Sequence, residues 1–219
     1  MAFWTSEPLN DTMRSYGSRS VPLDAGVETA RLETFSDGVF AIAATLLILE
    51  IRLPEQGSVT DGLLHLWPSY AAYAISFVII GIMWINHRAV FGVIDRVDRT
   101  FLAINVLFLL VIAFLPFPTE VLARHFHHDT KAAAFFYGLT NVAMAVMFSA
   151  VWFYASLGRR LISADADQRV VSGISRSFAP GIPLYTLATL SALISPWLAV
   201  GLFAGLAAFY LLESSLLAR

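Results

Sequence analysis

Long apolar runs separated by short polar segments dominate the hydropathy pattern of this chain. The first run is RLETFSDGVFAIAATLLILEIR, residues 31–52, which begins with charged and hydroxyl side chains and then becomes almost entirely apolar. Residues 35–51 would form about 25 Å of helix, close to the roughly 30 Å of a bilayer hydrocarbon core. The pattern predicts membrane-spanning helices at residues 31–51, 64–86, 99–118, 131–157, 178–194 and 196–213.

The continuity of these runs favours helices over a β-barrel. Backbone polar groups inside lipid must be paired within a helix or a closed barrel, and barrel strands alternate apolar and polar residues. Composition agrees, because 58% of the residues are hydrophobic, only 14% are charged and the mean hydropathy is +0.70. A soluble domain has about 25% charged residues. We therefore predict an all-α polytopic membrane protein with six transmembrane helices per subunit.

The polar segments predict the ends and connections of this domain. Residues 1–30 contain no apolar core behind a basic start, which is typical of a polar tail and not of a signal peptide. Loops are expected at residues 52–62 and 158–177, and a charged turn at HRAVFGVIDRVDR. The expected organisation is an N-terminal tail at 1–30, a transmembrane domain at 31–213 and a C-terminal tail at 214–219.

Arginine and lysine are distributed unequally between the two sides of the predicted topology. Eleven fall on the side of both termini, and three, Arg52, Arg124 and Lys131, fall on the other. Because cytoplasmic segments carry the excess of these residues, both termini are predicted to be cytoplasmic. We expect a multi-pass protein of the cell membrane, plasma or bacterial inner membrane, with the lipid bilayer as its surroundings.

A carboxylate lies one turn inside the first predicted span. Asp37 would be costly in lipid, so by default it faces protein or water and is a candidate functional residue. Arg31 lies on a different helix face and cannot pair with it directly. The alternative is that these charges reach the interface without a specific role. At the same predicted depth lie two donors on the next spans, so we predict a buried hydrogen-bonded cluster of Arg31, Ser36, Asp37, His87 and Asn105 around the Asp37 carboxylate.

Ile42, Thr45, Leu46 and Leu49 form one stripe along the first span, at helical offsets of 3, 4 and 7. Taken alone, such a stripe is typical of a face that packs on lipid or on another helix, and lining a pore is a further interpretation. Small residues beside it would allow a neighbouring helix to approach closely.

Other chemistry finds little support in the sequence. Three histidines, His125, His127 and His128, could bind a metal with Glu120 or Asp129, but their spacing matches no specific zinc pattern and a solvated loop is the simpler interpretation. The chain has no cysteine and no HExxH, GxSxG, Walker or GxGxxG motif, so we expect neither an enzyme nor a bound metal or cofactor. A net charge of -2 gives no support for nucleic-acid binding.

The first span resembles a known signature. In RLETFSDGVFAIAATLLILEI, Arg31, Phe35, Ser36 and Asp37 follow the Arg-x-x-x-Phe-Ser-Asp pattern of the lysosomal potassium channel family (transmembrane protein 175) and its prokaryotic relatives. NHRAVF at 86–91 and LAINVLFLLVIAFLPFPTEVL at 102–122 resemble that family's second and third spans, whereas the last three spans agree in number and hydropathy only. One six-span unit, as in prokaryotic members, implies a homotetramer with the first helix lining a central pore.

The resemblance also implies a function for the stripe. Ile42, Leu46 and Leu49 would form narrow apolar layers and Thr45 a hydroxyl layer, in a family that lacks a carbonyl selectivity filter. Narrow apolar rings exclude water and ions until they widen. The expected function is a potassium-permeable channel with K⁺ as the permeant monovalent cation. The alternatives are a proton-coupled or secondary transporter that uses Asp37 and His87 as a relay, and a non-conducting membrane scaffold.

Overall fold

The structure of the protein, a computed structural model, describes residues 25–52, 58–125 and 129–217. All named elements in these ranges are helices, which confirms the predicted all-α class. They are α1 (Ala25–Leu46), η2 (Leu47–Glu50), α2 (Val59–His65), α3 (Trp67–Phe91), α4 (Arg99–Phe114), α5 (Pro116–Arg124), α6 (Thr130–Ser156), η3 (Leu157–Arg159), α7 (Gln168–Phe178), α8 (Gly181–Ser191) and α9 (Pro196–Leu217).

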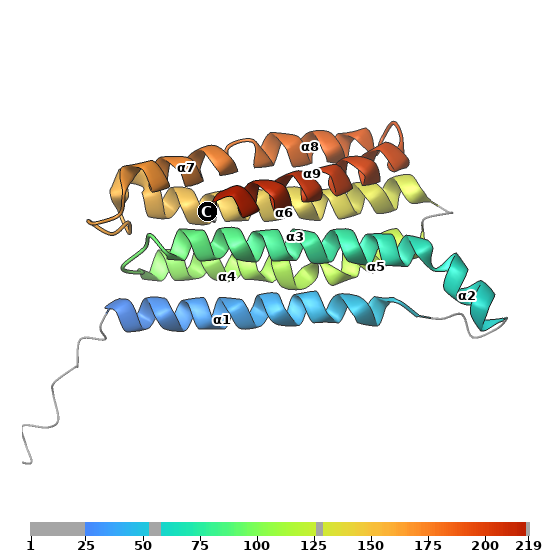
Figure 1. The fold of residues 1–219 in the computed structure, drawn as a ribbon, viewed down its shortest axis with the longest axis horizontal. Helices are drawn as coiled ribbons and strands as arrows, with labels where there is room; N and C mark the ends of the chain where they lie inside the picture. Colours follow the sequence, from blue (N-terminus) through green and yellow to red (C-terminus); the bar gives the residue numbers. More distant parts are fainter. Residues whose placement is uncertain (1–24, 53–57, 126–128, 218–219) are drawn as a thin grey trace, which may run out of the picture.

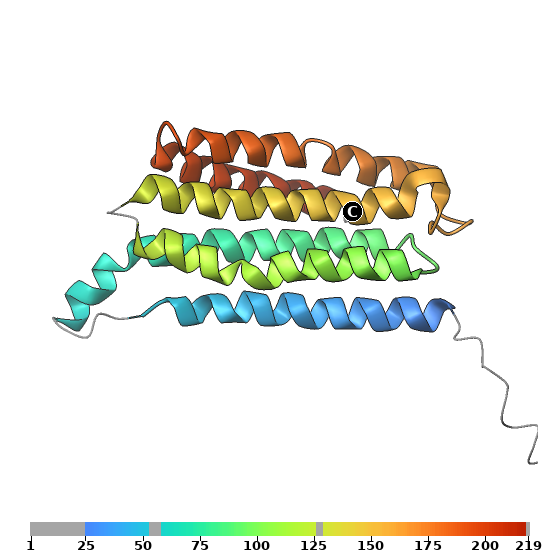
Figure 2. The same ribbon diagram turned by 180° about the vertical axis from the view of Figure 1, so that it is seen from behind.

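The long helices run side by side in three layers (Figure 1). α1 forms one outer layer and packs on α3 and α4 in the middle layer, whose other side packs on the outer layer of α6, α8 and α9. The same order is seen from behind, where α2 projects from the end at which α1 leads into α3 (Figure 2). Consequently, only one side of α1 is covered by the rest of the subunit.

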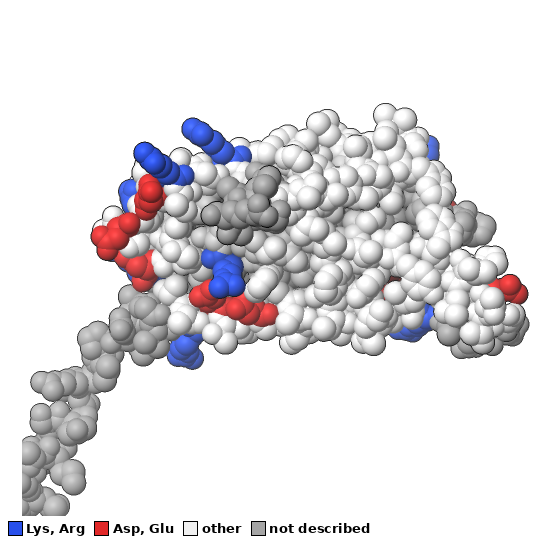
Figure 3. Space-filling view, viewed as in Figure 1, with Lys and Arg blue, Asp and Glu red and all other residues white. Residues whose placement is uncertain are grey.

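Among the described residues, four helical segments are long and apolar enough to cross a bilayer: Glu28–Glu50, Trp67–Phe91, Arg99–Arg124 and Thr130–Arg159. A fifth apolar segment, Pro196–Leu212, is shorter. Charged side chains gather toward the ends of the elongated molecule, and most of the visible length between them is uncharged (Figure 3). The chain is therefore a multi-pass membrane protein, and six complete spans stay a prediction.

The third predicted span extends beyond its expected end at residue 118. α4 ends at Phe114, and Pro116 begins α5, which continues to Arg124. A proline disrupts a helix interior because it lacks an amide hydrogen, but that hydrogen has no helical partner in the first turn. Pro116 and Pro118 both lie in the first turn of α5. The backbone stays helical at Leu115 and the span continues to Arg124, so the predicted end of this span is wrong.

Two further predicted boundaries are wrong because helices extend into charged sequence. α1 begins at Ala25, inside the predicted tail, whose residues 1–24 lie outside the described part of the chain. α3 continues through the HRAVF segment to Phe91, where a turn was expected. Long basic side chains can reach interfacial water while the backbone stays helical. His87 therefore belongs to the same rigid helix as the second span.

Two predicted loops also contain helices. α2 occupies the end of the 52–62 segment, and α7 occupies the second half of the 158–177 segment. α7 buries Val171 and Ile174 and exposes Arg169 and Arg176. Such a helix is apolar along one face only, so its average hydropathy resembles that of a polar loop.

Buried hydroxyl groups join the middle layer to α6. Tyr137 Oη lies 3.0 Å from Ser76 Oγ, which lies 2.8 Å from Thr119 Oγ1. The Thr119 hydroxyl donates to Leu115 O at 2.8 Å, so Ser76 donates to Thr119 and Tyr137 donates to Ser76.

α6 and α8 approach closely at Gly138, next to Tyr137. A Cβ at this position would lie 2.6 Å from a side-chain oxygen of α8, so only glycine permits this approach.

At the arginine-rich end, the α3–α4 loop pairs with the segment after η3. Ile94 and Ile162 form an antiparallel bridge. Asp98 caps α4 by accepting hydrogen bonds of 2.8 Å from the Phe101 amide and 2.8 Å from the Tyr154 hydroxyl. These donors, the Phe101 amide first, hold the pKa of Asp98 below its usual value. The two connections thus hold α4 and α6 in register.

Candidate pore-lining helix

α1 has a covered half and an exposed half. The covered positions recur every three or four residues and face α3 and α4: Leu32, Ser36, Phe40, Ala43 and Leu47. The exposed half carries large apolar side chains, including Phe35, of which 57% is exposed. On a helix that crosses a membrane, such a half faces lipid, another subunit or an aqueous path.

All four residues of the predicted pore stripe lie on the exposed half. Ile42 and Leu49 are 61% and 60% exposed, Leu46 is 40% exposed, and Thr45 is also exposed. Leu49 lies in η2, which continues α1 as a tighter helical turn. The stripe is therefore reachable by a second copy of the chain or by water, and it does not pack against α3 or α4.

The Thr45 hydroxyl directs its hydrogen toward its own helix. Its Oγ1 lies 3.0 Å from Ala41 O and 2.9 Å from Ile42 O, and it is the donor because a carbonyl can only accept. A hydroxyl has a single hydrogen, so what Thr45 offers to the exposed side is an acceptor oxygen. An oxygen acceptor is the group that a cation requires.

Three fully buried polar side chains, the polar triad Ser36, His87 and Asn105, join α1, α3 and α4. Asn105 Nδ2 donates to Ser36 Oγ at 3.1 Å, and Ser36 Oγ donates to Leu32 O at 2.8 Å. His87 Nε2 lies 3.0 Å from Asn105 Oδ1. An amide oxygen only accepts, so His87 Nε2 carries the hydrogen. The polar triad therefore fixes α1 to the two helices that cover it.

Aromatic rings enclose the polar triad. His87 stacks on Phe91 and Phe108, with ring centroids 4.4 Å and 5.9 Å apart, and meets the edge of Phe40 at 5.4 Å. In such apolar surroundings water cannot replace a lost hydrogen bond, so each polar atom depends on its protein partner. The position of α1 is thus set by directional bonds inside an otherwise apolar contact.

Asp37 lies outside the polar triad, so its predicted place at the centre of a buried cluster is wrong. Asp37 is exposed and accepts a hydrogen bond of 2.8 Å from Trp84 Nε1. Successive helical side chains point about 100° apart, so burying Ser36 turns Asp37 to the edge of the covered face. A sequence signal for this pair existed, because Trp84 precedes His87 by three positions and shares its side of α3.

Arg31, the remaining member of the predicted cluster, is not brought to the triad either. Arg31 is exposed, and among the described residues no hydrogen bond or ion pair connects its guanidinium with the polar triad. No hydrogen bond links Asp37 directly to His87 in that part of the chain. The proton relay considered above therefore has no direct Asp37–His87 step.

A groove of about 540 Å³ lies between α1 and α3 on the exposed side. Asp37, Phe40 and Ala41 line it from α1, and Gly81 and Trp84 are among the α3 residues that line it. Nothing lies within 4 Å of the position that a Cβ would take at Gly81. Small residues on membrane helices leave room for the side chains of a neighbouring helix. Apolar side chains form most of the groove wall, and Asp37 contributes a carboxylate to it.

The opposite end of α1 brings together charges that are isolated in the sequence. Glu50, the last residue of η2, lies close to Glu120 on α5, with Arg52 and Arg124 nearby. Glu120 also pairs with Arg124 at 2.6 Å. This group was not predicted from the sequence, because the third span was expected to end at residue 118. Only a helix that continues past Pro118 carries Glu120 alongside η2.

The histidine loop offers no metal site within the described ranges. His125 Nδ1 donates to Val121 O at 3.0 Å, in its own helix. His127 and His128 lie outside those ranges, and no group of three potential ligands occurs inside them.

Comparisons with known proteins relate this arrangement to a family. The model of a family described as the endosomal/lysosomal potassium channel TMEM175 matches residues 31–116, which include the polar triad and the exposed stripe. A protein named as a potassium channel from Chamaesiphon minutus is 41% identical over 194 residues, which cover 86% of this chain and 96% of that protein. The chain belongs to the TMEM175 family.

Two further comparisons place it among the prokaryotic TMEM175 proteins. A protein named as a potassium channel from Streptomyces collinus is 42% identical over 189 residues, covering 84% of this chain and 91% of its own length. The crystal structure of a lysosomal potassium-selective channel TMEM175 homolog from Chamaesiphon minutus superposes with a TM-score of 0.79 at 39% identity, covering 85% of this chain and 98% of that one. The predicted family is therefore confirmed, and the chain shares the TMEM175 fold over nearly the full length of these relatives.

Proposed function

We propose that the chain is the subunit of a potassium-permeable channel whose pore is lined by the exposed half of α1. The names of the Chamaesiphon and Streptomyces relatives support potassium as the permeant ion. The observation that carries the pore assignment is the composition of that half, where the Asp37 carboxylate and the Thr45 hydroxyl lie among large apolar side chains. A side that met only lipid would place a carboxylate in hydrocarbon at a cost of several kcal/mol.

In this proposal, four copies form a closed ring with α1 next to the axis. A ring is the usual way for one chain with one pore helix to enclose a path. The stripe occupies only part of the exposed half of α1; the remainder, together with α3, forms the groove that would receive the neighbouring copy. The assembly is thus a homotetramer in which Asp37 and Trp84 lie near the subunit boundary.

The proposed subunit crosses the cell membrane six times. Its spans are α1, α3, α4 with α5, α6, α7 with α8, and α9, and together they form the channel domain. Both termini are placed in the cytoplasm, on the side of the arginine-rich loops. α9 supports this reading because it runs back toward the end at which α1 begins (Figure 1).

The proposed gate is the set of apolar layers at Ile42, Leu46 and Leu49. When these side chains approach the axis, water leaves the constriction and ions are excluded. When they move apart, K⁺ passes with part of its hydration shell, and the acceptor oxygen of Thr45 replaces some of the lost water contacts. No cofactor takes part. The polar triad supports the proposal by holding the covered side of α1, which leaves the stripe directed away from the subunit.

Ion flux in liposomes tests the function. The purified full-length protein should dissipate a potassium gradient and drive the membrane potential toward the potassium equilibrium value without any second ion gradient. Protein-free liposomes provide the baseline, and a potassium ionophore provides the maximal response. Movement of potassium that requires stoichiometric counter-transport of protons would contradict the channel and support a carrier.

Disulfide crosslinking tests the assembly, because the chain contains no native cysteine. Leu49→Cys places one thiol on the exposed half of α1, and copies of α1 around an axis should form disulfide-linked dimers under mild oxidation. Leu187→Cys, on α8 and 63% exposed, is the matched control and should remain unlinked. Native mass spectrometry should show four subunits. A monomer in native lipid, or equal linking of both variants, would rule out the ring.

A further inference from the structure

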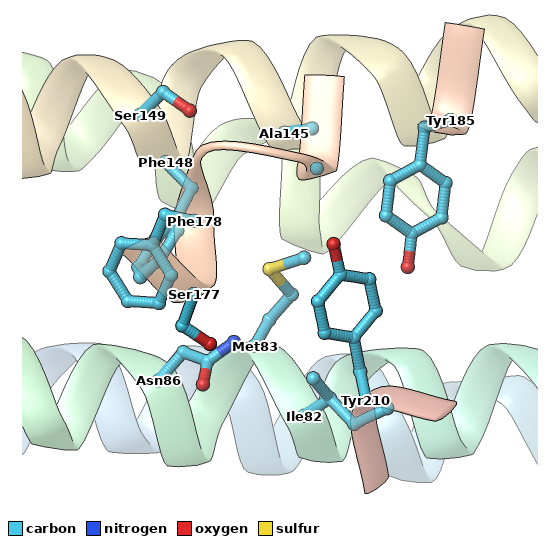
Figure 4. A pocket seen from close by; sticks show the side chains of 11 residues that line it. Ile82, Met83, Asn86, Ala145, Phe148, Ser149, Ser177, Phe178, Tyr185 and Tyr210 are labelled. Atoms are coloured by element: carbon cyan, nitrogen blue, oxygen red, sulfur yellow. The ribbon is translucent and has the colours of Figure 1, made fainter. Parts of the chain in front are cut away.

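A small cavity lies away from α1, between α3, α6, α9 and the α7–α8 junction (Figure 4). Its volume is about 30 Å³, and one water molecule needs roughly 10–15 Å³ measured in this way. Most of the wall is apolar, with Ile82 and Met83 from α3 and Phe148 from α6. Its polar residues come from five helices: Asn86, Ser149, Ser177, Tyr185 and Tyr210.

The Tyr185 hydroxyl is a buried polar group that requires a partner. Only 2% of Tyr185 is exposed, and its hydroxyl makes no hydrogen bond within the described part of the chain. The close view shows this hydroxyl directed into the cavity (Figure 4). The ring is held by stacking on Tyr210 and Phe203, with centroids 6.4 Å and 6.5 Å apart. Because the ring is held in this way, the hydroxyl stays in the cavity.

A break in the helical backbone lies beside the same cavity. α7 ends at Phe178 and α8 begins at Gly181, and both residues line the cavity. Pro180 and Pro183 have no amide hydrogen, so neither can donate to the carbonyl four residues earlier. Breaks of this kind persist in membrane helices where side chains or ordered water satisfy the freed backbone groups. The cavity therefore lies beside a stretch of backbone in which two helical hydrogen bonds are missing.

We propose that this cavity is a hydration site that holds one or two water molecules bound to the Tyr185 hydroxyl. The volume excludes larger ligands. Water is both donor and acceptor, so it can accept from Tyr185 and donate to the oxygen of Ser149 or Asn86. The bound water then links α8 to α3 and α6 at the level of the helix break. This site is separate from the proposed pore and independent of the ion that the pore conducts.

X-ray hydroxyl-radical labelling of the full-length protein in lipid nanodiscs tests the proposal directly. Radicals formed from a bound water oxidise the side chain next to it, so Met83 should be oxidised rapidly. The critical comparison is between the parent and Tyr185→Phe, in which Met83 oxidation should fall several-fold because the water loses its anchor. Met144 is fully buried outside the cavity and should stay slow in both.

Thermal unfolding of the same variants gives the second readout. If Tyr185 is bonded to water, Tyr185→Phe removes a hydrogen bond and should lower the melting midpoint by about 2–4 °C. If the cavity is dry, the substitution removes a hydroxyl that has no hydrogen-bond partner, and the midpoint should rise or stay unchanged. Tyr70→Phe, at a partly exposed position, is the control for loss of a tyrosine hydroxyl. Met83 oxidation that Tyr185→Phe does not change, or a midpoint that does not fall, overturns the proposal.

Discussion

Replacement of Ile42 by asparagine is expected to raise potassium conductance on the order of tenfold, which corresponds to a barrier lower by about 1.4 kcal/mol. Ile42 is the first apolar layer of the exposed stripe, and 61% of its surface is free of the subunit that carries it. An amide ring at this level would keep water in the constriction at a width where isoleucine side chains expel it. Planar-bilayer recordings of single channels measure the change.

The control for Ile42→Asn is the same change at an exposed leucine away from α1. Leu110 on α4 is 64% exposed, so Leu110→Asn adds an equivalent amide to the outer surface of the subunit. Its conductance should match that of the parent. Parental conductance in Ile42→Asn, at equal amounts of assembled protein, would place Ile42 away from the pore and assign the exposed half of α1 to lipid or to subunit contacts.

The positions of the long helices and the faces of α1 could be predicted from the sequence, because they follow from hydropathy and helical periodicity. Long apolar segments must be helical in lipid, so hydropathy located α1, α3, α4 and α6. The period of an α-helix placed Ile42, Thr45 and Leu46 on one side, and the structure leaves that side uncovered. The depth of His87 and Asn105 could be derived from topology alone, and in the structure Asn105 bonds to both His87 and Ser36.

The rotation of α1 and the charged group at its far end could not be predicted in this way, because they depend on contacts between helices. Whether Ser36 or Asp37 is buried depends on a rotation of α1 by about 100°, and hydropathy does not fix this rotation because both residues are polar. A proline at position 116 can end one helix or begin the next. The sequence alone therefore does not show whether the third span continues past it. The proximity of Glu50 to Glu120 follows only after that choice is known.

The polar triad connects the packing between helices with the direction of the exposed stripe, because its hydrogen bonds fix one rotation of α1 about its axis. Turning α1 enough to bury Asp37 would withdraw Ser36 from Asn105 and direct part of the stripe toward α3. The same bonds that stabilise the subunit therefore determine which side chains face away from it. Damage to the triad should affect folding and conductance together, whereas damage to the stripe should affect conductance alone.

Asn105→Ala is accordingly expected to be among the most destabilising substitutions in the chain. It removes the acceptor of His87 Nε2 and the donor to Ser36 Oγ, and both partners remain fully buried. Each unpaired group costs about 1–3 kcal/mol, against a total stability of about 5–15 kcal/mol for a typical domain. The melting midpoint of the purified protein should fall by at least about 5 °C, and the yield of assembled protein and the potassium flux should fall with it.

Asn141→Ala is the matched control, because it deletes the same side chain at an equally buried site. Asn141 Nδ2 donates to Tyr137 O at 2.9 Å, within α6, so this bond ties no second helix. The two substitutions leave cavities of similar size, and the difference between their melting midpoints isolates the loss of the bonds between helices. A smaller loss is also expected for Asp37→Asn, which keeps an acceptor for Trp84 Nε1 at an exposed position. Equal losses in Asn105→Ala and Asn141→Ala would show that α1 is held by apolar packing, and the polar triad would then have no part in directing the stripe toward the pore.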